Sequence, residues 1–386
     1  MNVQRSRLLV LVFLVDFLLT GFSAQTIRAQ RPTPLTSFKF TDDKNVDSQK
    51  ALSAYHQAVE KHRQGKDLEA IADLKQAVAL NPGFAEAYNS LCVVYDALNQ
   101  QGDAISNCQH AIALKSDYVP AFYNLGLVLE SGNHRADAIT NLKHVITLDP
   151  GYAAAHYHLG QLYDKDGLYE LAQESLKRAI AVRPEYASAY NELGFSYSIA
   201  GRFDEAIAAF REAVRLAPGE AHFQGNLGTA HYLAGHYPEA IASLSRAIDQ
   251  KPDLQIAQNN LGEVYLKTSQ YPEAINCFRR AIDLGSDTSE YQPGIYNDLA
   301  AAYAHLTKYK KAAEFLAKAI QLKPDFGTAI YNLGVVDLMV NDKAGAYQQY
   351  VALKSLNAEL AEKLYTRMFG AKILQVKPAV SFTESP

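Results

Sequence analysis

The sequence predicts an all-α fold, a solenoid of about nine helical hairpins followed by one further helix. The first observation is that alanine recurs every 34 residues, with one longer step of 38 before the eighth copy. The second is a small residue in the first half of each repeat, and the third is a leucine that precedes it in eight copies. The nine alanines are Ala70, Ala104, Ala138, Ala172, Ala206, Ala240, Ala274, Ala312 and Ala346. Units of this length cannot bury their apolar faces alone, so they must stack.

Residues 187–220 show the unit most clearly. Tyr190, Leu193, Gly194 and Tyr197 recur at i, i+3, i+4 and i+7, which is one face of a helix. Gly201 follows, and glycine readily takes the positive φ with which a helix ends and the chain reverses. A second apolar stripe fills residues 203–214 before proline ends it. We therefore expect a helical hairpin whose apolar stripes face each other.

The second small site marks the first helix of every hairpin. It holds Ala58, Cys92, Gly126, Gly160, Gly194, Gly228, Gly262, Ala300 and Gly334. A larger side chain at such a site would overpack the hairpin and destabilise it by roughly 1–3 kcal/mol. We expect this small residue to face the small residue of the second helix, so that the two helices approach closely.

The order of an aromatic, Leu-Gly, Tyr, then Ala, an aromatic or Leu, Ala and Pro resembles the tetratricopeptide repeat family over about residues 51–360. The resemblance implies a right-handed α-solenoid and a capping helix at 361–370. The expected repeats are 51–84, 85–118, 119–152, 153–186, 187–220, 221–254, 255–288, 293–326 and 327–360.

The two ends of the chain differ from the repeats. Arg5 and Arg7 precede an aliphatic run, and small residues follow at 21–24, a pattern typical of a signal peptide over residues 1–24. An uncleaved anchor and a soluble amphipathic tail are the alternatives. Residues 25–50 are polar and predict a flexible linker, and residues 371–386 predict an unstructured tail. The sequence thus predicts an exported protein, periplasmic or secreted, with no membrane span in the mature chain. The absence of any Asn-x-Ser/Thr site favours a bacterial source.

No residue pattern indicates catalysis, a cofactor or a metal site. The eleven histidines fall at different repeat positions, and neither a nucleophile motif nor a phosphate loop is present. The net charge of −4 disfavours a nucleic-acid groove, which needs a basic surface. We therefore expect a protein that is not an enzyme.

Three cysteines are too few for a disulfide framework. Cys92 and Cys108 lie in one repeat and face each other across its hairpin. The favoured interpretation is two buried free thiols that fill core space, with a disulfide as the alternative. Cys277 has no evident partner.

Asparagine recurs beside the Leu-Gly pair on the face that lines the groove in this family. Together with three tyrosines at the same phase, it gives the predicted contact residues Asn89, Tyr123, Asn124, Tyr157, Asn191, Asn226, Asn259, Asn260, Asn297, Tyr331 and Asn332. An amide both donates and accepts, so it can pair with the backbone of an extended peptide. The asparagine before Leu-Gly resembles the ladder in the repeats of O-linked N-acetylglucosamine transferases. The alternative is a solvated residue that was copied along with its hairpin.

An acidic run, Asp96, Glu130 and Asp164, occupies one phase near the ends of three first helices, and Tyr232, Leu266 and Leu338 follow at that phase. Such a groove would prefer a ligand of matching polarity.

These observations predict a non-catalytic scaffold that binds a peptide or protein partner in its concave groove. The alternative is a non-catalytic subunit or targeting module of an envelope enzyme complex, for example in glycosyl transfer or in secretion and assembly.

Overall fold

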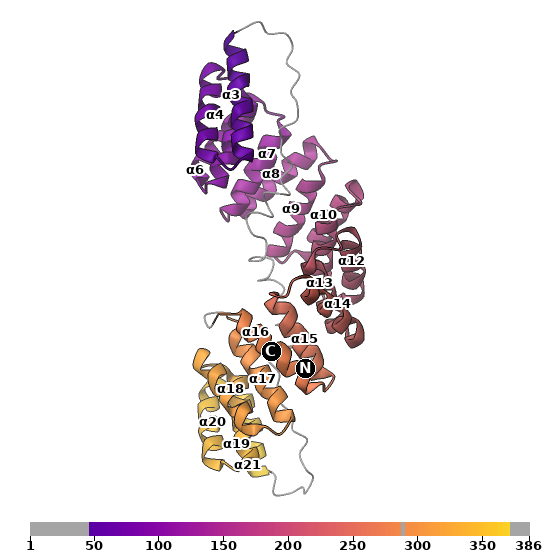
Figure 1. Ribbon diagram of the computed structural model, residues 1–386. Coiled ribbons are helices and arrows are strands. Elements are labelled where there is room, and N and C mark those ends of the chain that lie inside the picture. Colours follow the sequence, from indigo (N-terminus) through magenta and orange to yellow (C-terminus); the bar gives the residue numbers. More distant parts are fainter. Residues whose placement is uncertain (1–45, 287–289, 371–386) are drawn as a thin grey trace. The chain divides into compact units, whose positions relative to one another are not determined.

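The fold is all α. The computed structural model describes residues 46–286 and 290–370, and within these ranges it holds nineteen helices and no strand (Figure 1). The first ten are α3 (Val46–Arg63), α4 (Asp67–Leu80), α5 (Ala85–Ala97), α6 (Gln101–Leu114), α7 (Val119–Ser131), α8 (Arg135–Leu148), α9 (Ala153–Lys165), α10 (Tyr169–Val182), α11 (Ala187–Ile199) and α12 (Phe203–Leu216). The others are α13 (Ala221–Ala234), α14 (Tyr237–Gln250), α15 (Gln255–Lys267), α16 (Tyr271–Leu284), α17 (Gln292–His305), α18 (Tyr309–Leu322), α19 (Gly327–Met339), α20 (Lys343–Leu356) and α21 (Ala358–Phe369).

The helices follow the predicted hairpins, with two shifts at the ends. The first helix begins at Val46, so residues 46–50, predicted as linker, are helical instead. The last helix begins at Ala358, three residues before the predicted start at 361. The predicted signal peptide, the rest of the linker and the tail from residue 371 lie outside the described residues.

The chain divides into two compact units. The N-terminal unit comprises described residues 46–196, and the C-terminal unit comprises 197–286 and 290–370. In each unit the two helices of a hairpin contact each other, and the second helix contacts the first helix of the next hairpin, as α6 contacts α7 and α16 contacts α17. Each hairpin is thus one layer of a helical repeat solenoid.

The periodic alanines form the centre of this packing. All nine have no exposed surface. The small residue of the first helix is also buried. A Cβ atom added to Gly160 would lie 2.5 Å from Cγ of Leu176, sixteen residues on, and 3.3 Å from the backbone oxygen of Ala172, the periodic alanine of the second helix. One added to Gly228 would lie 2.6 Å from Cγ of Leu244. The glycine therefore lies beside the small residue of the second helix, as expected, and it also makes room for a large side chain of that helix.

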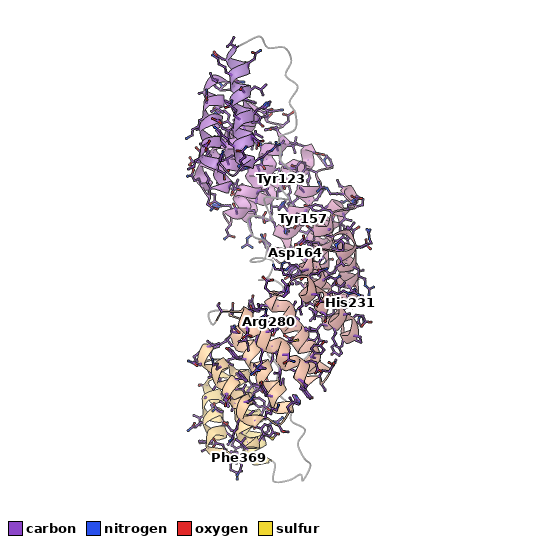
Figure 2. The ribbon with its side chains drawn as sticks, viewed as in Figure 1. Tyr123, Tyr157, Asp164, His231, Arg280 and Phe369 are labelled. Carbon is purple, nitrogen blue, oxygen red and sulfur yellow. A yellow bond between two sulfur atoms is a disulfide. The ribbon has the colours of Figure 1, made fainter. Side chains whose placement is uncertain are left out.

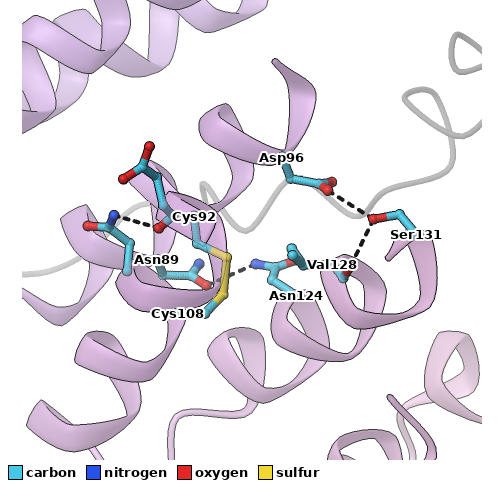
Figure 3. Close-up of a disulfide and its surroundings, with 9 residues drawn as sticks. Asn89, Cys92, Asp96, Cys108, Asn124, Val128 and Ser131 are labelled. Atoms are coloured by element: carbon cyan, nitrogen blue, oxygen red, sulfur yellow. Dashed lines mark hydrogen bonds between the residues drawn. A yellow bond between two sulfur atoms is a disulfide. The ribbon is translucent and has the colours of Figure 1, made fainter. Parts of the chain in front are cut away.

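Cys92 and Cys108 occupy this same pair of positions and form a disulfide, with an S–S distance of 2.08 Å (Figure 3). The favoured interpretation of two free thiols was wrong. The reason is geometric, because positions sixteen apart approach each other in the hairpins of Gly126, Gly160, Gly228 and Gly262, and here both positions carry sulfur. Cys277 is a free, half-buried thiol.

The turn inside each hairpin has positive φ at one fixed position. Glycine occupies it in four repeats, among them Gly201 with φ 74°, as predicted. In the other five it holds Asn99, Asn133, Ser269, Thr307 or Asn341. The turn geometry is thus kept even where the side chain makes it costly.

The last helix covers the end of the array. Leu364 and Ala361 of α21 are buried, and a Cβ atom added to Gly334 of α19 would lie 2.5 Å from Cδ2 of Leu364. Leu364 therefore takes the place that the second helix of the hairpin fills in earlier repeats.

Candidate functional site

The candidate site is the first-helix face, defined as the side of the first helices that carries the predicted asparagines and tyrosines. In the N-terminal unit it comprises α5, α7, α9 and the start of α11, and in the C-terminal unit α13, α15, α17 and α19. Figure 2 labels Tyr123, Tyr157 and Asp164 in succession along the first helices of the N-terminal unit. Polar contacts across this face join residues 35 apart, one repeat plus one position.

The predicted asparagines are buried. All eight are at most 8% exposed. The amide nitrogen of Asn124 donates to Oδ1 of Asn89 at 2.9 Å (Figure 3). In the C-terminal unit the same contact joins Asn332 to Asn297 at 2.8 Å. These amides thus hydrogen-bond one repeat to the next, whereas both sequence-based interpretations assumed exposed side chains.

Two further asparagines also bond within the protein. Asn260 donates to the Thr229 hydroxyl at 2.8 Å, and Asn259 donates to Oε1 of Glu263 at 2.7 Å. Because buried amides need partners, these contacts account for the choice of asparagine without a ligand. That the asparagines contact a partner stays a prediction, and it would require these bonds to be exchanged.

The three tyrosines are buried as well, at most 3% exposed. The Tyr123 ring lies 4.9 Å from the Tyr152 ring, and the Tyr157 ring lies 5.0 Å from that of Tyr186. Tyr123 and Tyr157 therefore each pack against the aromatic residue at the end of their own repeat instead of presenting a flat surface. The guanidinium carbon of Arg367 lies 6.0 Å from the centre of the Tyr331 ring. Burial raises the pKa of Tyr157 well above its usual value, so its hydroxyl stays protonated.

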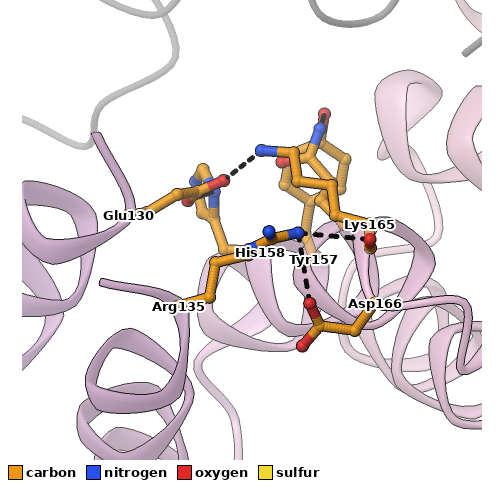
Figure 4. A network of polar contacts seen from close by, with 7 residues as sticks. Glu130, Arg135, Tyr157, His158, Lys165 and Asp166 are labelled. Carbon is orange, nitrogen blue, oxygen red and sulfur yellow. Dashed lines mark hydrogen bonds and ion pairs between the residues drawn. The ribbon is translucent and has the colours of Figure 1, made fainter. Parts of the chain in front are cut away.

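The first two members of the acidic run have partners within the protein. Oδ1 of Asp96 accepts from the Ser131 hydroxyl at 3.3 Å (Figure 3). Oε1 of Glu130 accepts from Nζ of Lys165 at 2.8 Å, and Oε2 lies 3.4 Å from Nδ1 of His158 (Figure 4). Burial alone would raise the pKa of Glu130, but its contacts with His158 and Lys165 outweigh burial and hold the pKa at about 2. Glu130 is thus an ionised carboxylate whose charge is balanced by the ion pair with Lys165, and it does not offer a free negative charge.

Asp164 differs from the other two. Neither of its carboxylate oxygens has a hydrogen-bond partner among the described residues, although both are buried. Glu192, in the next first helix, is 2% exposed, and its Oε1 also has no partner there. Burial raises the pKa of Asp164 to about 7. Burial, and then the charge of Asp164, raise the pKa of Glu192 to about 8. The Ser196 hydroxyl lies near Asp164 and lowers its pKa, but this hydroxyl also makes a long contact of 3.5 Å with the Tyr169 carbonyl.

The corresponding phase in the C-terminal unit is less polar. Leu266 is buried there, and Tyr232 and Leu338 are half-buried. Each unit therefore carries its own polarity at this phase, and the acidic character is confined to the N-terminal unit.

Sequence reasoning missed Glu192, Lys165 and His158. Glu192 and His158 each stand immediately before the repeat leucine, at a position that asparagine holds in other repeats. The signal that could have found them is the repeat spacing itself, since Lys165 follows Glu130 by 35 positions and Glu192 follows Asp164 by 28. The first spacing joins the C-terminal ends of α7 and α9, and the second joins the C-terminal end of α9 to the middle of α11.

Within the described ranges, no group of three His, Cys, Asp or Glu side chains could hold a metal ion. No described helix has both the length and the apolar character that crossing a bilayer requires.

Two family models, both described as tetratricopeptide repeat, match the sequence. One matches residues 123–172, 162–221 and 196–255, and the other matches 253–325. Together they span 123–325, more than half of the 386 residues. The chain belongs to the tetratricopeptide repeat family. Tetratricopeptide repeat proteins bind peptides or other proteins, so this chain is, in general terms, a protein-interaction scaffold.

Solved structures share the tetratricopeptide fold. The Cut9–Hcn1 hetero-tetramer of APC/C gives a TM-score of 0.51 at 16% identity, covering 83% of this chain and 76% of that one. A tetratricopeptide repeat protein from Parabacteroides merdae gives 0.50 at 15% identity, covering 66% and 99%. PilW, a type IV pilus biogenesis factor, gives 0.50 at 21% identity, covering 54% and 96%. No curated protein sequence matches this tetratricopeptide repeat chain.

Proposed function

We propose that the chain is a non-catalytic scaffold that binds a peptide segment or a protein along its first-helix face. The observation that carries the proposal is the contrast between the contact inside the hairpins and their first-helix face. The contact between the helices of each hairpin is closed by buried alanines and by glycines with no room for a Cβ atom. The first-helix face, in contrast, gathers charged and amide side chains, three of whose carboxylate oxygens lack donors among the described residues.

A charge-introducing pair of substitutions tests which side binds. Val93→Arg and Ser131→Arg place two cations on the first helices α5 and α7. The matched control, Gln109→Arg and Thr140→Arg, places two cations at exposed sites on the second helices α6 and α8. The partner is first captured with the full chain from the native envelope and then purified. We expect its affinity to fall by about tenfold or more with the first pair and to change little with the second, because binding hot spots lie in desolvated contacts. Equal losses would refute the assignment of the face.

We also propose that the protein is exported to the periplasm or secreted. The disulfide between Cys92 and Cys108 supports this location, because disulfides persist in oxidising compartments and are rare in the cytosol. Cell fractionation followed by alkylation of free thiols tests it. We expect the fractionated protein to leave one cysteine, Cys277, open to alkylation after denaturation. Three alkylated cysteines in protein from a cytosolic fraction would refute the proposal.

The alternative, a non-catalytic subunit or targeting module of an envelope enzyme complex, makes the same face a docking surface for an enzyme. Activity that co-purifies with the captured partner and is absent from the purified chain would favour this alternative.

A further inference from the structure

Three carboxylate oxygens form one cluster without donors on the first-helix face of the N-terminal unit. They are both oxygens of Asp164 and Oε1 of Glu192, and all three are inaccessible to water in the structure. Burying a carboxylate without a hydrogen-bond donor or a counter-charge is unfavourable, so native proteins rarely leave one in that state. A site with three such oxygens is therefore incomplete without a positive group.

The two carboxyls come from adjacent repeats. Asp164 lies near the end of α9, and Glu192 lies in the middle of α11. Glu192 is 2% exposed, whereas the Asp164 residue as a whole is half-buried, so the cluster is closest to solvent on the Asp164 side. Its uncharged polar neighbours are Gln161, Asn191 and Ser196. The Gln161 amide, itself half-buried, donates to the Tyr157 hydroxyl at 3.0 Å.

No cation in residues 46–286 and 290–370 completes this cluster. Lys165 is the positive group that acts on Glu192, and its Nζ lies 2.8 Å from Oε1 of Glu130. The neighbouring Arg135 pairs with Asp166 at 3.2 Å, on another side of α9 (Figure 4). Glu130 and Asp166 thus form ion pairs, whereas no cation among the described residues lies within ion-pair distance of Asp164 or Glu192.

We propose that Asp164 and Glu192 form a subsite for one basic side chain, lysine or arginine, of the bound partner. This inference rests on the proposed function, because it names the partner chemistry that the first-helix face selects. The basic group donates to the three oxygens, so that it supplies both the donors and the charge that they lack. A charge-assisted hydrogen bond of this kind is stronger than one between neutral groups. The subsite therefore distinguishes basic partner segments from neutral ones of the same shape.

In the free protein, protons on Asp164 and Glu192 take the place of the partner's cation. With pKa values of about 7 for Asp164 and about 8 for Glu192, the pair carries little charge in mildly acidic solution. The charged groups that act on Glu192 are Asp164 and Lys165 on α9, and the titratable groups that face it are Tyr157 and Tyr186. Both tyrosines have raised pKa values and stay neutral. A basic side chain binds best when both carboxyls have lost their protons, so its binding should strengthen as the pH rises toward 9.

Selection of short random peptides displayed on phage against the full chain tests the proposal. We expect the enriched peptides to share a lysine or arginine at one position. Replacing that residue by glutamine should weaken binding by about tenfold or more. Glu192→Gln should abolish the preference and the increase of affinity with pH. Glu174→Gln, an exposed site on α10 of the neighbouring repeat, removes the same charge and should change neither.

The other outcomes overturn either the subsite alone or the proposed function with it. Enriched peptides without a shared basic position, or peptides that bind wild type and Glu192→Gln equally, overturn the subsite and leave the proposed function intact. Failure to enrich any peptide, together with failure to capture a protein partner, overturns the proposed function and the subsite with it. If Glu192→Gln loses its helical circular dichroism, Asp164→Asn replaces it and must give the same loss of preference.

Discussion

At the residue scale, the most informative side chains are the ones whose environment contradicts their chemistry. Glu192 is a carboxyl at 2% exposure without a donor for Oε1, and Asp164 is in the same position with both oxygens. Each therefore prefers its protonated form when folded. Gly160 is a residue of the opposite kind, since its lack of a side chain is what the packing requires.

The carboxyl pair makes stability depend on pH. The folded pKa of Glu192, about 8, lies above the ordinary glutamate value of 4.5, so the folded state binds more protons than the unfolded chain between these values. This contribution to stability is fully present below the lower value and is lost as the pH rises through the higher one. We expect the urea concentration at the unfolding midpoint to decrease as the buffer is changed from mildly acidic to mildly alkaline.

Glu192→Gln should flatten this dependence, and at alkaline pH it should stabilise the protein by on the order of 2 kcal/mol. The exposed Glu174→Gln variant should keep the slope of wild type. A wild-type midpoint that does not change over this range, or a slope unchanged in Glu192→Gln, would contradict the environment assigned to the pair.

Glycine substitutions should separate close packing from helix propensity. Gly160→Ala places a Cβ atom 2.5 Å from Leu176 and should destabilise the fold by roughly 1–3 kcal/mol. Gly102→Ala, in α6, meets no atom within 4 Å and should stabilise it by about 0.5 kcal/mol. Thermal unfolding followed by circular dichroism measures both. The same sign of change in the two variants would show that the close contact does not govern stability at Gly160.

At the element scale, the hairpin is the conserved unit of construction within this chain, and each hairpin keeps two constraints. Its turn holds one residue at positive φ, and a large side chain lies against the small residue of its first helix, sixteen positions on in most hairpins and Leu364 of α21 in the last. Most hairpins fill the second contact with a small residue against leucine or phenylalanine. The second hairpin fills it with a disulfide.

The turn constraint predicts a stabilising substitution. Thr307 has φ 58°, a conformation that a β-branched residue adopts at a cost of about 1–2 kcal/mol. Thr307→Gly should therefore raise the free energy of unfolding by about 1 kcal/mol, once the greater freedom of glycine in the unfolded chain is subtracted. Gly201→Ala, at φ 74°, is the converse and should lower it. A loss of stability in Thr307→Gly would show that the threonine side chain contributes more than its backbone costs.

We predict that the residue pair found at this position in other hairpins can partly replace the disulfide. Cys92→Ala with Cys108→Ala removes a cross-link across 16 positions and should cost about 3 kcal/mol. Cys92→Gly with Cys108→Leu restores the pair found at Gly160 and Leu176, and should recover part of that loss through packing. Urea unfolding with and without reductant measures this. Reductant should lower the midpoint of wild type alone, and equal midpoints for the two double variants would show that packing at this site has little effect.

At the scale of the whole molecule, the repeat period carries most of the information about the fold. The nine alanines identify every hairpin, and all nine are buried as the predicted packing requires. The period does not show that the glycine of the first helix also makes room for the leucine sixteen positions on. Nor does it show that Asn124 and Asn89 lie within 2.9 Å, since that contact depends on how far consecutive hairpins approach. The unpaired Glu192 was hidden for the same reason, because burial and missing donors are properties of the packed structure.

Site-specific photo-cross-linking tests the central claim, binding along the first-helix face, most directly. A benzophenone amino acid replaces Gln161 on α9 in one variant and Gln109 on the exposed side of α6 in the other. The account predicts that irradiation in the native envelope joins the partner to the chain substituted at 161 and leaves the chain substituted at 109 without it. A partner cross-linked through 109 and absent at 161 would contradict the account.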